Sequence, residues 1–458
     1  MRKITQISKA IVLVLIIGTV LVSCKKKDEG PASQPTPTES NVVTITDNGS
    51  GIGTRTFHAD TVYLLEGFCF VNSGQTLTIE AGTIIKGKSG QGTASSALIV
   101  ARGGKINAVG TAAKPIIFTA EADDLNGSVD INARGLWGGV IILGNAQLNT
   151  IPAEQQIEGI PTTETRGTYG GTDDSDNSGT LTYVSIRHGG TDIGAGNEIN
   201  GLTFGAVGSG TTIDYIEILS NADDGIECFG GTPNIKHVLI NNCADDGLDY
   251  DQGFRGNVQF YCVLGTDDSN RCGEHDGGTT PEDGTPYAIP TIYNVTYIGV
   301  ASNTDCHIMT FRDNAGGYYY NSIFVNCYKG IDFEKLVSGE DSYNRYMNGQ
   351  LKIENNVFYN IAGQTVLTGN ENDFLYANGD SAIIASNGCD SILSAYFTLA
   401  NNSVANPGIS KSNPVPASSQ TSNMATYPAG STFFESVSYK GAFGNSNWAT
   451  GWTVTFSN

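Results

Sequence analysis

The residues best suited to chemistry are acidic residues that recur at a fixed spacing. Asp223-Asp224 recurs 22 residues later as Asp245-Asp246, and Asp267-Asp268 follows after the same interval. Carboxylates on successive turns repel each other unless a cation, a shared proton or solvent relieves them. Calcium binds six to eight carboxylate and carbonyl oxygens. The predicted calcium ligands are Asp223, Asp224, Glu227, Asp245, Asp246 and Asp249. In the alternative, which stays open, these residues fill tight turns and cap backbone N–H groups.

These acidic residues lie in two segments, 213–227 and 235–249, that align without a gap. Each segment holds an apolar strand, a turn and a second short strand. A repeat of this length predicts a coiled β-solenoid, because one turn alone cannot bury its apolar face. Alternation places Ile216 and Val238 inside, with Glu217 and Leu239 outside.

The second strand of each coil is a triplet in which two apolar residues flank one outward residue. The triplets are Ile226-Glu-Cys228, Leu248-Asp-Tyr250, Met309-Thr-Phe311 and Ile331-Asp-Phe333. The last two are again 22 residues apart, which places Arg312 over Glu334 with opposite charge. The chain is therefore predicted to be an all-β, parallel β-helix with inserted loops, spanning roughly residues 60 to 410.

The N-terminus has the pattern of an export signal. Basic residues precede the apolar run 10–22, and the segment ending at Cys24 resembles a bacterial lipobox. We expect residues 1–23 to be a signal peptide and Cys24 to be acylated, for example with palmitate. Residues 24–40, rich in Pro, Ser and Thr, are expected to form a tether to the membrane. The domain boundaries are then 41–430 for the β-helix with its N-terminal cap and 431–458 for an aromatic-rich segment that caps the C-terminal end.

Charge and local pattern argue against two classes of partner. The net charge is −21, whereas nucleic-acid binding depends on Lys and Arg. Residues 82–89 match the phosphate-binding loop pattern, but their interior has the pattern of a strand and no helix follows, so we expect no nucleotide. Eight cysteines besides Cys24 show no obvious disulfide framework, and their pairing stays open.

Several further segments carry a resemblance to a known group. They are Leu77-Thr-Ile-Glu-Ala-Gly-Thr83, Trp137-Gly-Gly-Val-Ile-Ile-Leu-Gly-Asn145, Tyr183-Val-Ser-Ile-Arg-His-Gly-Gly190, Asn200-Gly-Leu-Thr-Phe204 and Gly441-Ala-Phe-Gly444 with Trp448 to Trp452. Together they are similar to Bacteroidota surface lipoproteins that carry a right-handed parallel β-helix of the pectate-lyase superfamily fold. The resemblance covers most of the chain and implies the fold, but it brings no reaction.

These patterns lead to three expectations about function. The first is a lipoprotein anchored in the outer membrane and exposed on the cell surface, whose β-helix binds a glycan or a surface protein. The second is a calcium-dependent polysaccharide lyase or glycoside hydrolase, with Arg255, Arg271, Lys329 and Lys335 as the basic residues beside the acidic turns. The third is a structural subunit of a surface assembly. The sequence motifs of pectate lyases and polygalacturonases are incomplete, so no catalytic residue is assigned.

Overall fold

The computed structural model describes residues 41–193, 199–418 and 420–457, apart from the side chain of Thr93. The predicted signal peptide, Cys24 and the tether lie outside the described residues. None of the helices in the described part of the chain is long and apolar enough to cross a membrane.

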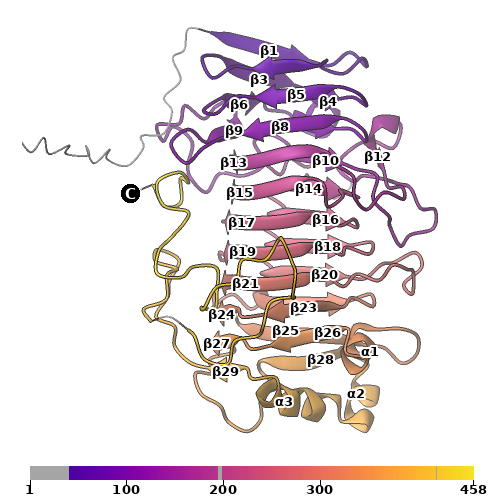
Figure 1. Ribbon diagram of the computed structural model, residues 1–458, viewed down its shortest axis with the longest axis vertical. Coiled ribbons are helices and arrows are strands. Elements are labelled where there is room, and N and C mark those ends of the chain that lie inside the picture. Colours follow the sequence, from indigo (N-terminus) through magenta and orange to yellow (C-terminus); the bar gives the residue numbers. More distant parts are fainter. Residues whose placement is uncertain (1–40, 194–198, 419, 458) are drawn as a thin grey trace, which may run out of the picture. The chain divides into compact units, whose positions relative to one another are not determined.

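The described residues wind into a right-handed parallel β-helix built on two sheets (Figure 1). The larger sheet has 17 strands: β1 (Val42–Thr46), β2 (Arg55–Phe57), β3 (Val62–Glu66), β5 (Thr76–Ile79), β6 (Ile84–Gly87), β8 (Lys105–Val109), β9 (Ile116–Ala120), β13 (Gly179–Arg187), β15 (Thr212–Leu219), β17 (Asn234–Asn241), β19 (Asn257–Leu264), β21 (Thr291–Ile298), β23 (Gly317–Tyr320), β24 (Ile323–Val325), β26 (Leu351–Glu354), β27 (Val357–Tyr359) and β29 (Ser403–Val404).

The second sheet has ten strands in simple order along the coil: β4 (Phe68–Val71), β7 (Ala97–Val100), β10 (Val140–Leu143), β14 (Leu202–Gly205), β16 (Ile226–Phe229), β18 (Leu248–Asp251), β20 (Gly273–Asp276), β22 (His307–Arg312), β25 (Lys329–Lys335) and β28 (Leu375–Gly379). The remaining elements are the hairpin β11 (Gln155–Gln156) and β12 (Thr168–Tyr169), two short 3₁₀ turns, η1 (Gly92–Ala94) and η2 (Thr165–Gly167), and three helices, α1 (Ser342–Met347), α2 (Ser381–Asn387) and α3 (Cys389–Leu399).

The predicted register is confirmed. Ile216 of β15 pairs with Val238 of β17, and Met309 of β22 pairs with Ile331 of β25, both 22 residues apart. All of these side chains are at most 1% exposed and lie in the continuous apolar core inside the coil. The alternation of inward and outward residues was therefore sufficient to position the strands.

The outward side chains Glu217 and Leu239 are also fully buried, because the C-terminal segment covers them. The sequence predicted that the C-terminal segment caps the end of the coil. Residues 431–457 lie instead along the outer face of the larger sheet (Figure 1). The Glu217 carboxylate accepts N–H bonds from Val454 and Thr455, each at 3.1 Å. We call residues 431–457 the C-terminal strap.

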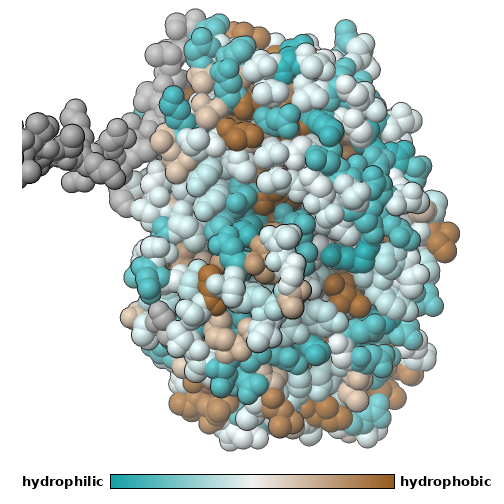
Figure 2. All heavy atoms as spheres, in the orientation of Figure 1, coloured by the Kyte–Doolittle hydropathy of each residue, from teal (hydrophilic) through white to brown (hydrophobic). Residues whose placement is uncertain are grey.

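The C-terminal end of the coil is instead closed by helices. Leu393 and Phe397 of α3 are fully buried, and the Phe397 ring lies 5.0 Å from Phe358 and 4.9 Å from Phe374. The other side of α3 leaves Leu399 80% exposed, and Figure 2 shows hydrophobic residues gathered at this end of the coil. The end therefore needs no aromatic strap to protect its core.

Candidate functional site

The predicted acidic turns form two layers with different roles. Asp224 and Asp246, 6% and 1% exposed, point inward. Asp224 Oδ1 accepts the N–H of Asp246 at 2.9 Å, and Asp246 Oδ1 accepts the N–H of Arg271 at 2.6 Å. These two carboxylates therefore cap the backbone of the next turn, as the structural alternative predicted.

The outer layer lines a polar hollow of about 480 Å³ beside the turns. Its acidic lining residues are Asp223, Asp245, Asp267, Asp268 and Asp305. Asp267 and Asp268 reach it from an insert and not from the predicted repeat position, because Leu248 pairs with Gly273, 25 residues on. Asn270 and Arg271 occupy the repeat positions instead, since their backbone bonds to Asp245 and Gly247 continue the turn ladder.

Two overlapping sets of three carboxylates fit a cation. Asp223, Asp224 and Asp245 form one set and Asp224, Glu227 and Asp249 the other, each with ligand atoms within 4.8 Å of one another. Asp246 belongs to neither and lies 3.7 Å from Arg271. Asp249 Oδ1 is buried and has no hydrogen-bond partner among the described residues. An all-oxygen set with an unsatisfied oxygen suits calcium, which these residues would hold as ligands.

The pKa values of the second set reflect its burial. Burial raises the pKa of Asp224 well above its usual range, and repulsion from Asp223 and Asp249 raises it further. Burial also raises the pKa of Glu227 and of Asp249. Repulsion from Glu227 raises the pKa of Asp249 further, and repulsion from Asp224 raises that of Glu227. A shared proton or a bound cation would relieve the repulsion within the set.

Glu227 and Asp249 also begin a polar ladder on the outer face of the ten-stranded sheet. Outward residues pair from strand to strand: Glu227 with Asp249, Asp249 with Glu274, Glu274 with Thr310, Thr310 with Asp332 and Asp332 with Tyr376. We call Glu227, Asp249, Glu274, Thr310, Asp332 and Tyr376 the outer ladder. Successive rungs of such a sheet are about 4.8 Å apart, so the polar groups form a regular row. Glu227, Thr310 and Asp332 are buried, and Asp249, Glu274 and Tyr376 are half-buried.

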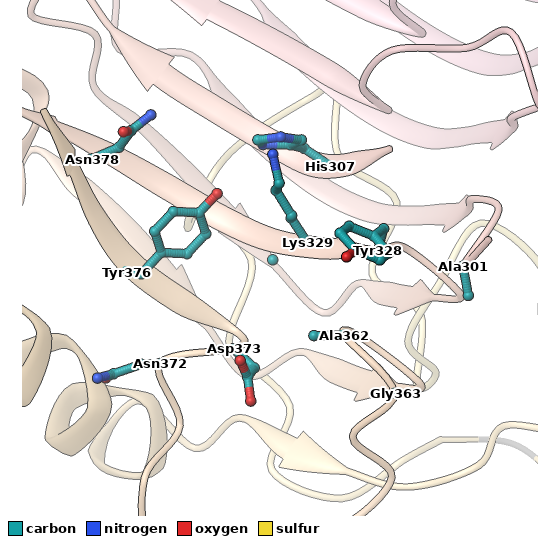
Figure 3. A pocket seen from close by; sticks show the side chains of 11 residues that line it. Ala301, His307, Tyr328, Lys329, Ala362, Gly363, Asn372, Asp373, Tyr376 and Asn378 are labelled. Carbon is teal, nitrogen blue, oxygen red and sulfur yellow. The ribbon is translucent and has the colours of Figure 1, made fainter. Parts of the chain in front are cut away.

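The far end of the outer ladder opens into a cavity of about 740 Å³ between β22, β25 and β28, which we call the ladder pocket (Figure 3). Its lining includes His307, Tyr328, Lys329, Asn372, Asp373, Tyr376 and Asn378. His307, Lys329 and Tyr376 come to the cavity from β22, β25 and β28 (Figure 3). Tyr328 is 43% exposed, an unusual position for a large aromatic side chain.

Asp332 is buried and bonds two side chains that line the ladder pocket, His307 and Asn378. Its Oδ1 accepts the Thr310 hydroxyl at 2.8 Å and lies 3.0 Å from His307 Nδ1, while its Oδ2 accepts the Asn378 amide at 3.2 Å. Burial raises the pKa of Asp332, but the hydrogen bonds from His307 and Thr310 outweigh it, so the pKa is lowered overall. Asp332 is therefore an anion that orients the His307 ring.

The positive residues of the region are divided between structure and site. Arg271 bonds Thr310 Oγ1 at 2.9 Å and Glu274 at 2.9 Å, which places its guanidinium on the outer ladder. Lys329 lines the ladder pocket and forms no ion pair with the described residues. Of the other predicted bases, Arg255 pairs with Asp174 and Lys335 with Asp341. The register led us to expect Arg312 over Glu334. Arg312 instead forms its ion pair with Asp276 at 2.7 Å.

Sequence reasoning had located the outer ladder without recognising it. The middle residues of the four predicted triplets are Glu227, Asp249, Thr310 and Asp332. Tyr328, Tyr376 and Asn378 were missed, because β28 follows β25 after a long insert and no fixed spacing points to it. Tyr328 could have been identified as an aromatic residue directly before β25, the strand that carries the ladder residue Asp332.

Comparison with known proteins identifies the family. Residues 50–398 match the model of the pectate-lyase-like β-helix domain. No curated protein and no solved structure matches the chain. The family match spans the outer ladder, the ladder pocket and both carboxylate sets, and it agrees with the parallel two-sheet coil. The chain belongs to the family of pectate-lyase-like β-helix domains.

Proposed function

We propose that the protein is a surface lipoprotein, anchored in the outer membrane, that binds a polysaccharide along the outer ladder. The observation that carries the proposal is the continuity of the outer ladder with the ladder pocket. The half-buried ladder residues Asp249, Glu274 and Tyr376 lead to the cavity, an arrangement that suits a chain-like ligand with one residue held in the cavity. A glycan is favoured over a protein partner, because the ladder pocket is concave and combines aromatic with polar side chains, whereas a protein interface is a broad patch with an apolar centre.

The chemistry of the ladder pocket matches a sugar ring. Tyr328 offers an exposed aromatic face for the C–H side of a pyranose. Asn372, Asp373 and Asn378 supply donors and acceptors for hydroxyl groups, and Lys329 adds a positive charge. The volume of the pocket, about 740 Å³, is in the usual range for a ligand site of this kind.

Binding to a panel of purified polysaccharides tests the proposal, measured by calorimetry with the full chain. At least one polysaccharide is expected to bind the wild type, and Tyr328→Ala should weaken that binding at least tenfold, about 1.4 kcal/mol. Lys105→Ala removes an exposed lysine on the other sheet and serves as the control for Lys329→Ala. Equal weakening by both lysine variants, or no binding by any polysaccharide, would count against the site.

A second candidate function is calcium-dependent polysaccharide cleavage, favoured by one observation. Asp224, Glu227 and Asp249 lie within 4.8 Å of one another, and Asp249 Oδ1 lacks a partner among the described residues. A calcium ion held there would acidify the proton beside a sugar carboxylate, and Arg271 lies on the same outer ladder as a base. New absorbance from unsaturated sugar ends, dependent on calcium, would establish this activity. Its absence with a polysaccharide that binds would leave binding as the function.

The membrane anchor belongs to the same proposal and is supported by the sequence around Cys24. In cells fed a labelled fatty acid, the wild-type protein should carry the label and Cys24→Ser should not. Protease added to intact cells should remove the wild-type protein if it faces the exterior. Label on Cys24→Ser, or a fully protected protein, would contradict the anchoring or the orientation respectively.

A further inference from the structure

Three buried cysteines lie side by side on three successive coils next to the ladder pocket. The N–H of Cys272 donates to His307 O at 3.1 Å, and the N–H of Lys329 donates to Cys306 O at 3.0 Å. Cys272 and Cys306 stand directly before β20 and β22, and Cys327 stands two residues before β25. All three side chains are at most 3% exposed.

The sulfur atoms of Cys306 and Cys327 are close to each other. A methyl group added at Gly299 would lie 2.4 Å from Cys327 Sγ and 2.5 Å from Cys306 Sγ. Both sulfur atoms therefore lie within 2.5 Å of one point. Because His307 pairs with Lys329, Cys327 stands one residue from the position opposite Cys306. Rungs about 4.8 Å apart and residues about 3.3 Å apart along a strand keep such a pair within the Cα separation of a disulfide. A side chain at position 299 would clash with both sulfur atoms, so only glycine fits there.

The surroundings of Cys306 favour its thiolate. The hydrogen bond with Cys327 lowers the pKa of Cys306 to about 7, against the opposing effect of burial. The N–H of Val300 donates to Cys306 Sγ at 3.4 Å and acts in the same direction. A thiolate is the form that attacks a disulfide, and it is most effective when its pKa is near the ambient pH.

We propose that Cys306 and Cys327 form a disulfide that fixes the floor of the ladder pocket. The Cys306 thiolate attacks a small-molecule or protein disulfide and releases one thiolate. Cys327 then loses its proton, displaces the second thiolate and closes the Cys306–Cys327 bond, so the external disulfide is reduced to two thiols. The bond joins the residues directly before His307 and Tyr328, both of which line the ladder pocket.

A metal site is the less favourable use of these thiols. The sets of three potential ligands within 4.8 Å of one another in the described ranges are all carboxylate sets. Cys272 therefore does not complete a three-sulfur site with the other two cysteines. Cys327 also interacts with Cys272 through its side chain. Cys272 is therefore the thiol with which Cys327 can form a disulfide when Cys306 is replaced.

Thiol mapping by mass spectrometry tests the proposal. The full chain is refolded from the reduced, unfolded state in a glutathione buffer, its free thiols are alkylated, and its peptides are mapped. This arm does not depend on export or on glycan binding, so its failure is distinct from failure of the proposed function. One link, Cys306 to Cys327, is expected, with a mass lower by two hydrogen atoms.

Variants make the assignment specific. Cys327→Ala should abolish the link, Cys306→Ala should shift it to Cys272–Cys327, and Cys69→Ala, a buried thiol on β4, should leave it unchanged. Oxidation should raise the melting temperature of the wild type and not that of Cys327→Ala, which covers the case of poor refolding of one variant. Full alkylation of Cys306 and Cys327, a link elsewhere, or stoichiometric zinc with free thiols would overturn the proposal.

Discussion

At the scale of single residues, the site depends on buried or half-buried carboxylates that share one sheet face. Burial raises the pKa of Asp251 to about 7 and that of Glu334 to about 7. Neighbouring acidic residues act in the same direction, whereas Arg312 opposes them at Asp251. Such residues favour the fold when protonated and oppose it when ionised.

We therefore predict that stability falls as the pH rises. Asp251 and Glu334 have folded-state pKa values above their unfolded values of 3.8 and 4.5. Well below pH 3.8 both states are protonated and nothing is lost, and from there to about pH 7 the unfolded state releases protons that the folded state keeps. The melting temperature of chelated protein should drop by several degrees from pH 5 to pH 7.5, measured by calorimetry.

The same experiment separates proton effects from calcium. Asp251→Asn with Glu334→Gln should make the slope between pH 5 and pH 7.5 shallower, because an amide does not titrate, while Asp224, Glu227 and Asp249 keep part of it. Added calcium should restore the melting temperature at pH 7.5 if Asp224, Glu227 and Asp249 bind it. Buried His275, whose pKa burial lowers to about 3, acts in the opposite direction, so the comparison of the two proteins is the test: equal slopes in the wild type and the double variant would contradict the pKa assignments of Asp251 and Glu334.

At the scale of elements, the C-terminal strap covers the outer face of the larger sheet. Tyr183, Tyr215 and His237, each with positive φ, stack there with ring centroids 4.3 Å apart. Trp452 meets the Tyr183 ring edge-on at 5.4 Å, and Trp448 meets His237 at 5.3 Å. The strap therefore packs its two tryptophans against a ladder of rings that the coil repeats build.

Removal of one tryptophan tests how much the strap stabilises the fold. Trp452 is 1% exposed, so Trp452→Ala should lower the free energy of unfolding by about 3–5 kcal/mol, measured by denaturant titration. Leu399→Ala is the control, because that large apolar side chain on α3 is 80% exposed and should cost about 0.5 kcal/mol or less. Equal effects of the two variants would mean that the strap does not hold the sheet face.

The elements also show which features the sequence could and could not predict. The strands β15 to β19 can be predicted from alternation alone, because their inward residues repeat at nearly constant spacing. The strap could not be predicted, since Glu217 and Val454 are far apart in the chain and no local pattern links them. The third acidic turn was misplaced because a three-residue insert moves Asp267 out of the repeat, which sequence spacing alone does not reveal.

At the scale of the whole β-helix, each coil is a replaceable unit. A coil pairs only with the coils before and after it, so stability is close to a sum of coil terms and neighbour terms. Residue Ile213 pairs with Ile235, which means that residues 213–234 make one complete coil. The outer ladder and the ladder pocket form only when several coils stack. The register therefore predicts which residues make up the ladder, but not the volume of the pocket beside it.

Deletion of one coil is therefore predicted to preserve the fold. Without residues 213–234 the chain should remain β-rich and unfold cooperatively at a lower temperature, as judged by circular dichroism. Deletion of residues 213–223 starts at the same position and also removes Glu217, but it leaves half a coil and reverses the inward and outward faces of the next strands. We expect this second variant not to fold. Similar behaviour of the two variants would contradict the coil as the repeating unit.

The most direct measurement is a crystal structure of the protein with an oligosaccharide cut from a polysaccharide that it binds. The account predicts a sugar ring in the ladder pocket, against Tyr328 and within hydrogen-bond distance of Lys329 or Asn378, with the chain continuing toward Glu274 and the more exposed Arg312. A ligand bound elsewhere, on the larger sheet or at the strap, with an empty ladder pocket, would contradict it.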